Sequence, residues 1–152
     1  MHKLILTALT LSLAAPVVHA NPAETVAQAR IGYYRLVGLE METLAAMAKG
    51  EIPYDAEVAK QRAENLAALR SYNAKGLYAE GTSNVDLPGK TRAKPEIWQD
   101  LAGLQAKGAA FGEAIDGLLV VADQGEAAFK PAFGKLGGTC KACHDDFRAT
   151  DY

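Results

Sequence analysis

Two cysteines and a histidine lie close together near the end of the chain. Cys140 and Cys143 are the only cysteines of the sequence, and His144 directly follows the second, within the segment GTCKACHDDF. On a helix, side chains three and four residues apart share one face. The pattern C-x-x-C-H is the attachment motif of c-type haem, in which both thiols bond to the porphyrin and the histidine ligates the iron. The segment therefore predicts one covalently bound haem c, with His144 as its metal ligand.

The first 20 residues have the pattern of a secretory signal peptide. A short basic start precedes an uncharged apolar run from Leu4 to Val18, and small residues occupy the cleavage positions up to Ala20. The run is shorter than the roughly 20 residues that a membrane-spanning helix needs. We expect cleavage after Ala20, which leaves residues 21–152 as one exported domain with no membrane partner.

Other interpretations use the same three side chains. A structural zinc site generally needs four ligands, and the mature chain offers only Cys140, Cys143 and His144 from the Cys and His classes. A disulfide between residues three apart closes a very small loop and would add little stability. A thioredoxin-like redox pair usually lies where a strand leads into a helix, whereas these cysteines lie within a helical pattern. A thiol-redox protein without haem remains an alternative to the favoured haem interpretation.

The first half of the mature chain predicts two helices. Asn21 can cap a helix that starts at Pro22, and apolar or small side chains then recur at helical spacing until about Lys49. Asp55 is the expected cap of the second helix. A long connection follows over residues 73–95, rich in glycine, proline and other turn residues. A connection of this length inside a small domain is unusual, so we expect it to cross the bundle or cover a ligand.

The second half predicts two more helices and no strands. Pro95 and Glu96 open the third, whose apolar side chains repeat in steps of four and three as far as Ala122. The fourth follows a break at residues 123–125 and carries the haem motif. Four helices with one long joint predict an all-α protein, an antiparallel four-helix bundle with the covalently bound haem near the C-terminal helix.

The charge balance argues against nucleic acid as a partner. The sequence has 16 basic and 18 acidic side chains and a formal net charge of −2, so no strongly basic surface is expected. We also find no nucleophile–base pair or paired carboxylates. Asp145 and Asp146 are interpreted as part of a solvated helix face. The sequence therefore does not predict an enzyme.

The segments around these features resemble the cytochromes c′ of bacterial periplasms. KLGGTCKACHDDFR lies on the last predicted helix and GTSNVDLPGKTRAKPEIW precedes the third, and the likeness spans residues 21–152. The resemblance implies a periplasmic homodimer whose haem iron is held on one side only, by the histidine of the motif.

The resemblance also implies which residues surround the haem. Matching QARIGYYRLVGLEM to the first helix of the family places Tyr34 over the distal face of the iron, where it shields the metal without binding it. The same matching puts Arg30, Thr91 and Arg92 at the haem propionates or edge. Arg148 falls near the proximal histidine, one helical turn beyond it.

The sixth iron ligand separates two kinds of haem protein. Met41 lies seven residues beyond Tyr34, roughly 10 Å of helix rise, so the two cannot cover the same iron. A tyrosine with its usual pKa of about 10 stays protonated and is a poor ligand. We predict five-coordinate, high-spin iron that binds small gases such as NO and CO, exchanges electrons with a redox partner protein, or does both. The alternative is a low-spin electron carrier with Met41 as the sixth ligand.

Overall fold

The computed structural model describes residues 21–152, so the predicted signal peptide lies outside the described residues. The helices are α1 (Pro22–Lys49), α2 (Ala56–Arg70), the short 3-10 helix η1 (Ala74–Tyr78), α3 (Glu96–Gln99), α4 (Leu101–Val121) and α5 (Glu126–Phe147). No strand occurs in this part of the chain, and its one isolated β-bridge joins Ala93 and Arg148. The predicted all-α class is confirmed.

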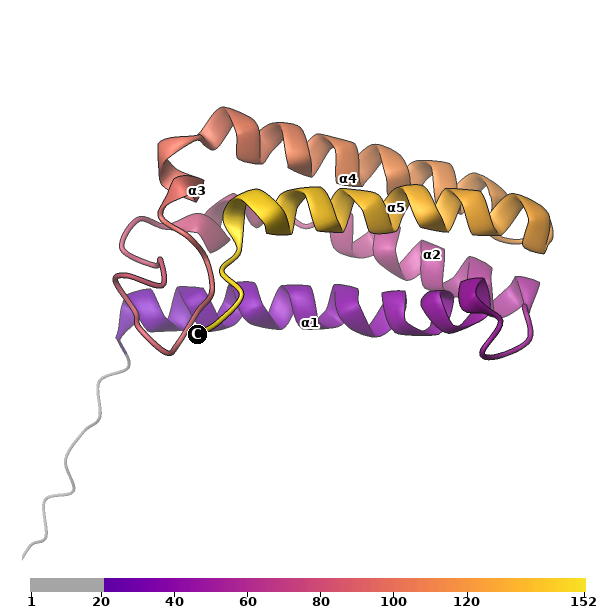
Figure 1. Ribbon diagram of the computed structural model, residues 1–152, viewed down its shortest axis with the longest axis horizontal. Coiled ribbons are helices and arrows are strands. Elements are labelled where there is room, and N and C mark those ends of the chain that lie inside the picture. Colours follow the sequence, from indigo (N-terminus) through magenta and orange to yellow (C-terminus); the bar gives the residue numbers. More distant parts are fainter. Residues whose placement is uncertain (1–20) are drawn as a thin grey trace, which may run out of the picture.

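The four long helices form an antiparallel bundle (Figure 1). In it, α1 contacts α2, α2 contacts α4, α4 contacts α5, and α5 returns to contact α1. Because α1 and α5 lie side by side, the first and last helices together form one side of the bundle (Figure 1). None of the helices within residues 21–152 is both long and apolar enough to cross a membrane.

Capping residues define where α1 begins and ends and where α2 begins. The Asn21 side chain accepts a hydrogen bond from the backbone N–H of Ala23, at 3.1 Å. At the other end Gly50 adopts a left-handed conformation, with φ of 75°, and its N–H is bonded to carbonyls of the last turn. Asp55 caps α2 by accepting from the N–H of Val58. The predicted starts of both helices and the end of the first are confirmed.

The prediction of one continuous third helix from Pro95 is wrong, because the helix is interrupted. The chain forms the four residues of α3 and then breaks at Asp100, whose φ of −128° and ψ of 66° are not helical. The Asp100 side chain accepts from the N–H of Gly103 at 2.8 Å and so caps a new helix, α4. Aspartate favours this capping position over a helix interior, and here it overrides the periodic pattern.

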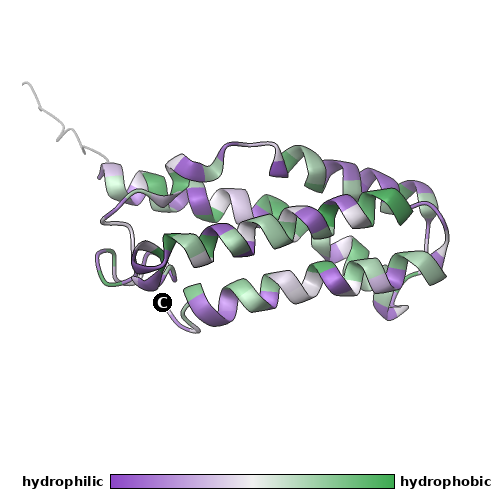
Figure 2. Cartoon of the chain, turned by 90° about the horizontal axis from the view of Figure 1, so that it is seen from above, coloured by the Kyte–Doolittle hydropathy of each residue, from purple (hydrophilic) through white to green (hydrophobic). Residues whose placement is uncertain are grey.

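Apolar side chains form two separate clusters. Each long helix carries both hydrophobic and hydrophilic residues (Figure 2), and the main cluster contains fully buried side chains of all four: Leu44, Met47, Leu66, Ile115, Leu118, Phe129 and Leu136. A smaller cluster is built on Ala93, Ile97 and Phe147. It joins the end of the long connection and α3 to the end of α5, which is where the haem motif lies.

Candidate haem site

The two cysteines project from α5 as free, half-buried thiols. Cys143 packs against the smaller cluster, whose neighbouring side chains include Tyr78 and Trp98. Burial raises the pKa of both the Cys140 and the Cys143 thiol. A catalytic thiol of the thioredoxin type has a lowered pKa, so this environment does not suit that chemistry.

His144 stands beside the thiols near the end of α5. Burial lowers the pKa of its imidazole, and the positive charge of Arg92 lowers it further. A lowered pKa keeps the imidazole neutral at pH 7, which is the form that binds a metal ion. Within residues 21–152, no cluster of three or more His, Cys, Asp or Glu side chains is arranged to hold a metal ion by itself. The site therefore offers one imidazole ligand and two thiols.

Tyr34 on α1 lies near the thiol end of this site. Burial is the main cause that raises the pKa of its phenol. The neighbouring Tyr78 and, more weakly, Cys143 raise the pKa further. Its hydroxyl lies 2.6 Å from that of Tyr78, in a hydrogen bond in which either can be the donor. Tyr34 nevertheless keeps 44% of its surface exposed. That aromatic surface is available to a flat group bound beside the thiols.

Arg30 lies one turn before Tyr34 on α1 and is only 4% exposed. Nη1 donates to the carbonyl of Leu77 and the hydroxyl of Thr82, both at 2.9 Å. Nη2 donates to the Thr82 carbonyl at 2.7 Å and to the Thr91 hydroxyl at 3.2 Å. The guanidinium also lies over the rings of Tyr78 and Trp98, 5.7 and 5.8 Å from their centroids. Arg30 thus fixes η1 and the long connection to α1.

The remaining predicted residues lie where the connection meets the end of α5. Thr91 is buried, and its hydroxyl accepts from Arg30 and from the N–H of Ala93. Arg92 donates to the carbonyl of Thr150 at 2.9 Å and lies close enough to His144 to affect its pKa. Arg148 has an exposed side chain, and its N–H donates to the carbonyl of His144. The structure thus brings Arg30, Tyr34 and Thr91 together, and places Arg92 and Arg148 beside His144.

Sequence reasoning missed three residues of this site: Tyr78, Thr82 and Trp98. Tyr78 ends η1, Thr82 lies in the connection, and Trp98 lies in α3. The available signal was the presence of two aromatic residues in and beside a glycine-rich connection that was expected to cover a ligand.

These residues fit a haem. Two thiols and an imidazole lie at positions i, i+3 and i+4 of one helix, and aromatic side chains lie beside them. Arg30 is a buried cation with no carboxylate within ion-pair distance among residues 21–152. A buried charge is costly without a counter-ion, and the propionates of haem are anions of the required kind.

Comparison with known proteins agrees with this geometry. The model of the family described as Cytochrome C′ matches residues 25–148. The chain belongs to the cytochrome c′ family. A cytochrome c′ of Cereibacter sphaeroides is 51% identical, with 97% of this chain and 98% of the relative covered.

Solved structures of the family superpose on most of the chain. A cytochrome c′ described as from Rhodobacter spheriodes has a TM-score of 0.83 and 54% identity, covering 86% of this chain and 99% of that one. Another, described as having an unusual ligand-controlled dimer dissociation, has a TM-score of 0.76 and 31% identity, covering 87% and 100%. The predicted resemblance and the four-helix bundle are confirmed. The family consists of haem electron-transport proteins that bind haem c.

Proposed function

We propose that the chain is an exported, periplasmic protein that binds one haem c covalently through Cys140 and Cys143, with His144 as the proximal iron ligand. Its iron is five-coordinate and high-spin, and it carries electrons, binds small gases such as NO and CO, or does both. The observation that carries this proposal is that Tyr34 of α1 is hydrogen-bonded to Tyr78, which packs against the same small cluster as Cys143. When bound, the haem supplies the redox change and the open coordination position.

The two methionines of the described chain do not favour the low-spin alternative. Met47 is only 2% exposed and belongs to the main core cluster. Met41 packs against the same cluster, whereas Cys143 belongs to the smaller one. A sixth ligand from either methionine would have to leave the main core, which supports an iron with no ligand on its distal side.

The surrounding residues have distinct proposed roles. Tyr34 shields the distal face from water and from larger ligands. Arg30, Thr91 and Arg92 hold the propionates or the haem edge, and Arg148 supports the proximal side next to His144. These roles require no catalytic acid or base, consistent with a family of electron carriers.

Replacing Tyr34 by alanine tests the distal assignment. We expect CO to bind ferrous Tyr34→Ala at least about tenfold more tightly than it binds the unmodified protein, because the ligand no longer has to displace a phenol. Val120→Ala is the control, since Val120 is 66% exposed and lies near the end of α4, away from both the haem motif and α1. Equal CO affinities in all three proteins, or a near-infrared charge-transfer band of methionine ligation in the ferric protein, would contradict the proposal.

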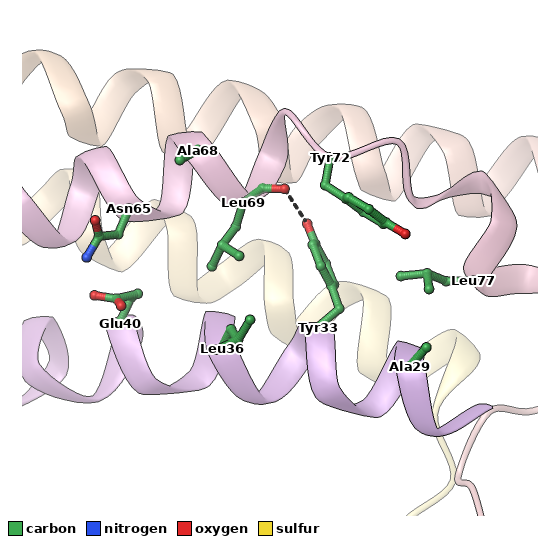
Figure 3. Close-up of a pocket in the computed structure, with 9 residues that line it drawn as sticks. All are labelled: Ala29, Tyr33, Leu36, Glu40, Asn65, Ala68, Leu69, Tyr72 and Leu77. Carbon is green, nitrogen blue, oxygen red and sulfur yellow. Dashed lines mark hydrogen bonds between the residues drawn. The ribbon is translucent and has the colours of Figure 1, made fainter. Parts of the chain in front are cut away.

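A groove between α1 and α2 supports a homodimer. It has a volume of about 540 Å³ and is lined mainly by apolar side chains: Ala29, Tyr33, Leu36, Glu40, Asn65, Ala68, Leu69, Tyr72 and Leu77. Figure 3 shows Tyr33, Leu36, Leu69 and Tyr72 projecting into it. Leu36 and Leu39 on α1 are 52% and 55% exposed. A largely apolar groove with exposed leucines beside it is typical of a protein interface, and we propose that a second copy of the chain covers it.

The groove is connected to the haem site through adjacent tyrosines. The rings of Tyr33 and Tyr34 meet edge to face, with centroids 5.1 Å apart and an angle of 83°. Tyr33 faces the groove, so a ligand that displaces Tyr34 would disturb the proposed dimer contact. The ligand-controlled dissociation described for one solved relative supports this coupling.

Sedimentation velocity tests the dimer. We expect Leu36→Lys/Leu39→Lys to be a monomer, because two buried charges would face the partner, and we expect CO to shift the unmodified protein toward monomer. Val120→Lys is the control, since Val120 is 66% exposed but lies on α4. A monomer in every sample, or a double variant that remains dimeric, would contradict this surface.

A further inference from the structure

The hydrogen bond between Tyr34 and Tyr78 joins two segments that are far apart in the sequence. It links α1 to the last residue of η1, across 44 positions of sequence. Its O–O distance of 2.6 Å is at the short end of the range for hydroxyl hydrogen bonds. The phenol proposed to cover the iron is thus held by a second phenol.

Tyr78 is held in place by contacts that do not involve Tyr34. Its carbonyl accepts from Nε1 of Trp98 at 3.1 Å, and its ring lies under the guanidinium of Arg30. The carbonyl of Leu77, the residue before it, accepts from Nη1 of Arg30 at 2.9 Å. Because Arg30 is buried and fixed by further bonds to Thr82 and Thr91, Tyr78 cannot follow a movement of Tyr34 without disrupting this network.

We propose that Tyr78 is a positioning residue that keeps Tyr34 closed over the distal face and thereby limits the rate of gas entry. The inference rests on the proposed function, in which Tyr34 must move aside for a ligand. That movement breaks the bond between the two hydroxyls. The bond stabilises only the closed, unliganded state, so its loss should speed ligand association and leave ligand dissociation unchanged.

The first test measures CO association and dissociation on the ferrous holoprotein by flash photolysis and ligand replacement. We expect Tyr78→Phe to bind CO roughly three- to tenfold faster, from the usual contribution of one hydrogen bond, with the dissociation rate within about twofold of the unmodified value. Tyr34→Phe removes the same bond from the other side and should give a similar increase. The double variant should be no faster than either single variant.

The matched control is Tyr54→Phe. The Tyr54 hydroxyl donates to the carbonyl of Ala122 at 2.7 Å and accepts from the N–H of Gly125 at 3.2 Å, so this variant also loses the hydrogen bonds of a tyrosine hydroxyl. It is remote from the site, because Tyr54 packs on Phe129 in the main core. We expect Tyr54→Phe to lower stability but to leave CO association unchanged.

A second readout does not depend on gas binding. In urea unfolding of the ferric protein, the loss of unfolding free energy in Tyr34→Phe/Tyr78→Phe should be smaller than the sum of the two single losses, because both variants break one shared bond. Strict additivity, or unchanged CO association in Tyr78→Phe despite coupling, would overturn the proposal. If the unmodified protein does not bind CO, the proposed gas binding is wrong. The proposal that Tyr78 limits the rate of gas entry is then wrong as well. Coupling in the unfolding cycle would then still show that the bond itself exists.

Discussion

Protein with serine in place of both Cys140 and Cys143 should carry no covalently bound haem. The two thiols are half-buried on one face of α5, and no other cysteine exists in the sequence to form a thioether. After denaturing electrophoresis, the unmodified protein should stain for haem and the double variant should not. Each single variant retains one thiol and should stain with reduced yield.

Lys141→Ala is the control for this experiment. Lys141 lies between the two cysteines, is exposed, and pairs with Asp145 one turn further along the helix. We expect its haem stain to equal that of the unmodified protein. An unmodified protein that is exported but colourless would support the thiol-redox alternative, as would a mass that lacks the haem.

Replacing Arg30 by methionine should cause the largest loss of stability among the site variants, about 3 kcal/mol of unfolding free energy. The variant leaves the buried carbonyls of Leu77 and Thr82 without this donor, and each unpaired buried group costs about 1–3 kcal/mol. Urea unfolding followed by far-UV circular dichroism measures the effect. Arg30→Lys keeps the charge but not the planar guanidinium, so its loss should be intermediate.

Arg35→Met provides the comparison on the same helix. Arg35 is exposed on α1 and takes part in no ion pair among residues 21–152. We expect its unfolding free energy to stay within about 0.5 kcal/mol of the unmodified value. If Arg30→Met and Arg35→Met were equally stable, the hydrogen bonds of Arg30 to the connection would contribute nothing net.

The sequence predicted those parts of the fold that depend on local interactions. The starts of α1 and α2 follow from side chains that cap the helix within three residues, and the end of α1 follows from a glycine in the left-handed conformation. The haem motif is local too, since its three side chains lie within five residues of one helix. Such features need no knowledge of the rest of the chain.

Features that depend on contacts between distant parts of the chain could not be predicted from the sequence. The periodic pattern of the third predicted helix runs on through Asp100, and only the capping geometry shows that the helix restarts there. Tyr78 and Trp98 belong to the site because Arg30 lies over both rings from another helix. Sequence spacing carries no information about such a contact. The placement of Tyr34, Thr91 and Arg148 came from family resemblance rather than from the residues themselves.

The contact between α1 and α5 has a consequence for how the protein matures. These helices are the first and last of the bundle, so their pairing closes a loop that includes nearly all of residues 21–152. Closing a long loop costs chain entropy before the contacts formed can compensate, which makes this pairing a slow step of folding. Because a short turn joins α4 to α5 and the two pack extensively on each other, we expect this pair to form early and α5 to close against α1 last. The proposed attachment of haem to the thiols of α5 would then precede this final closure.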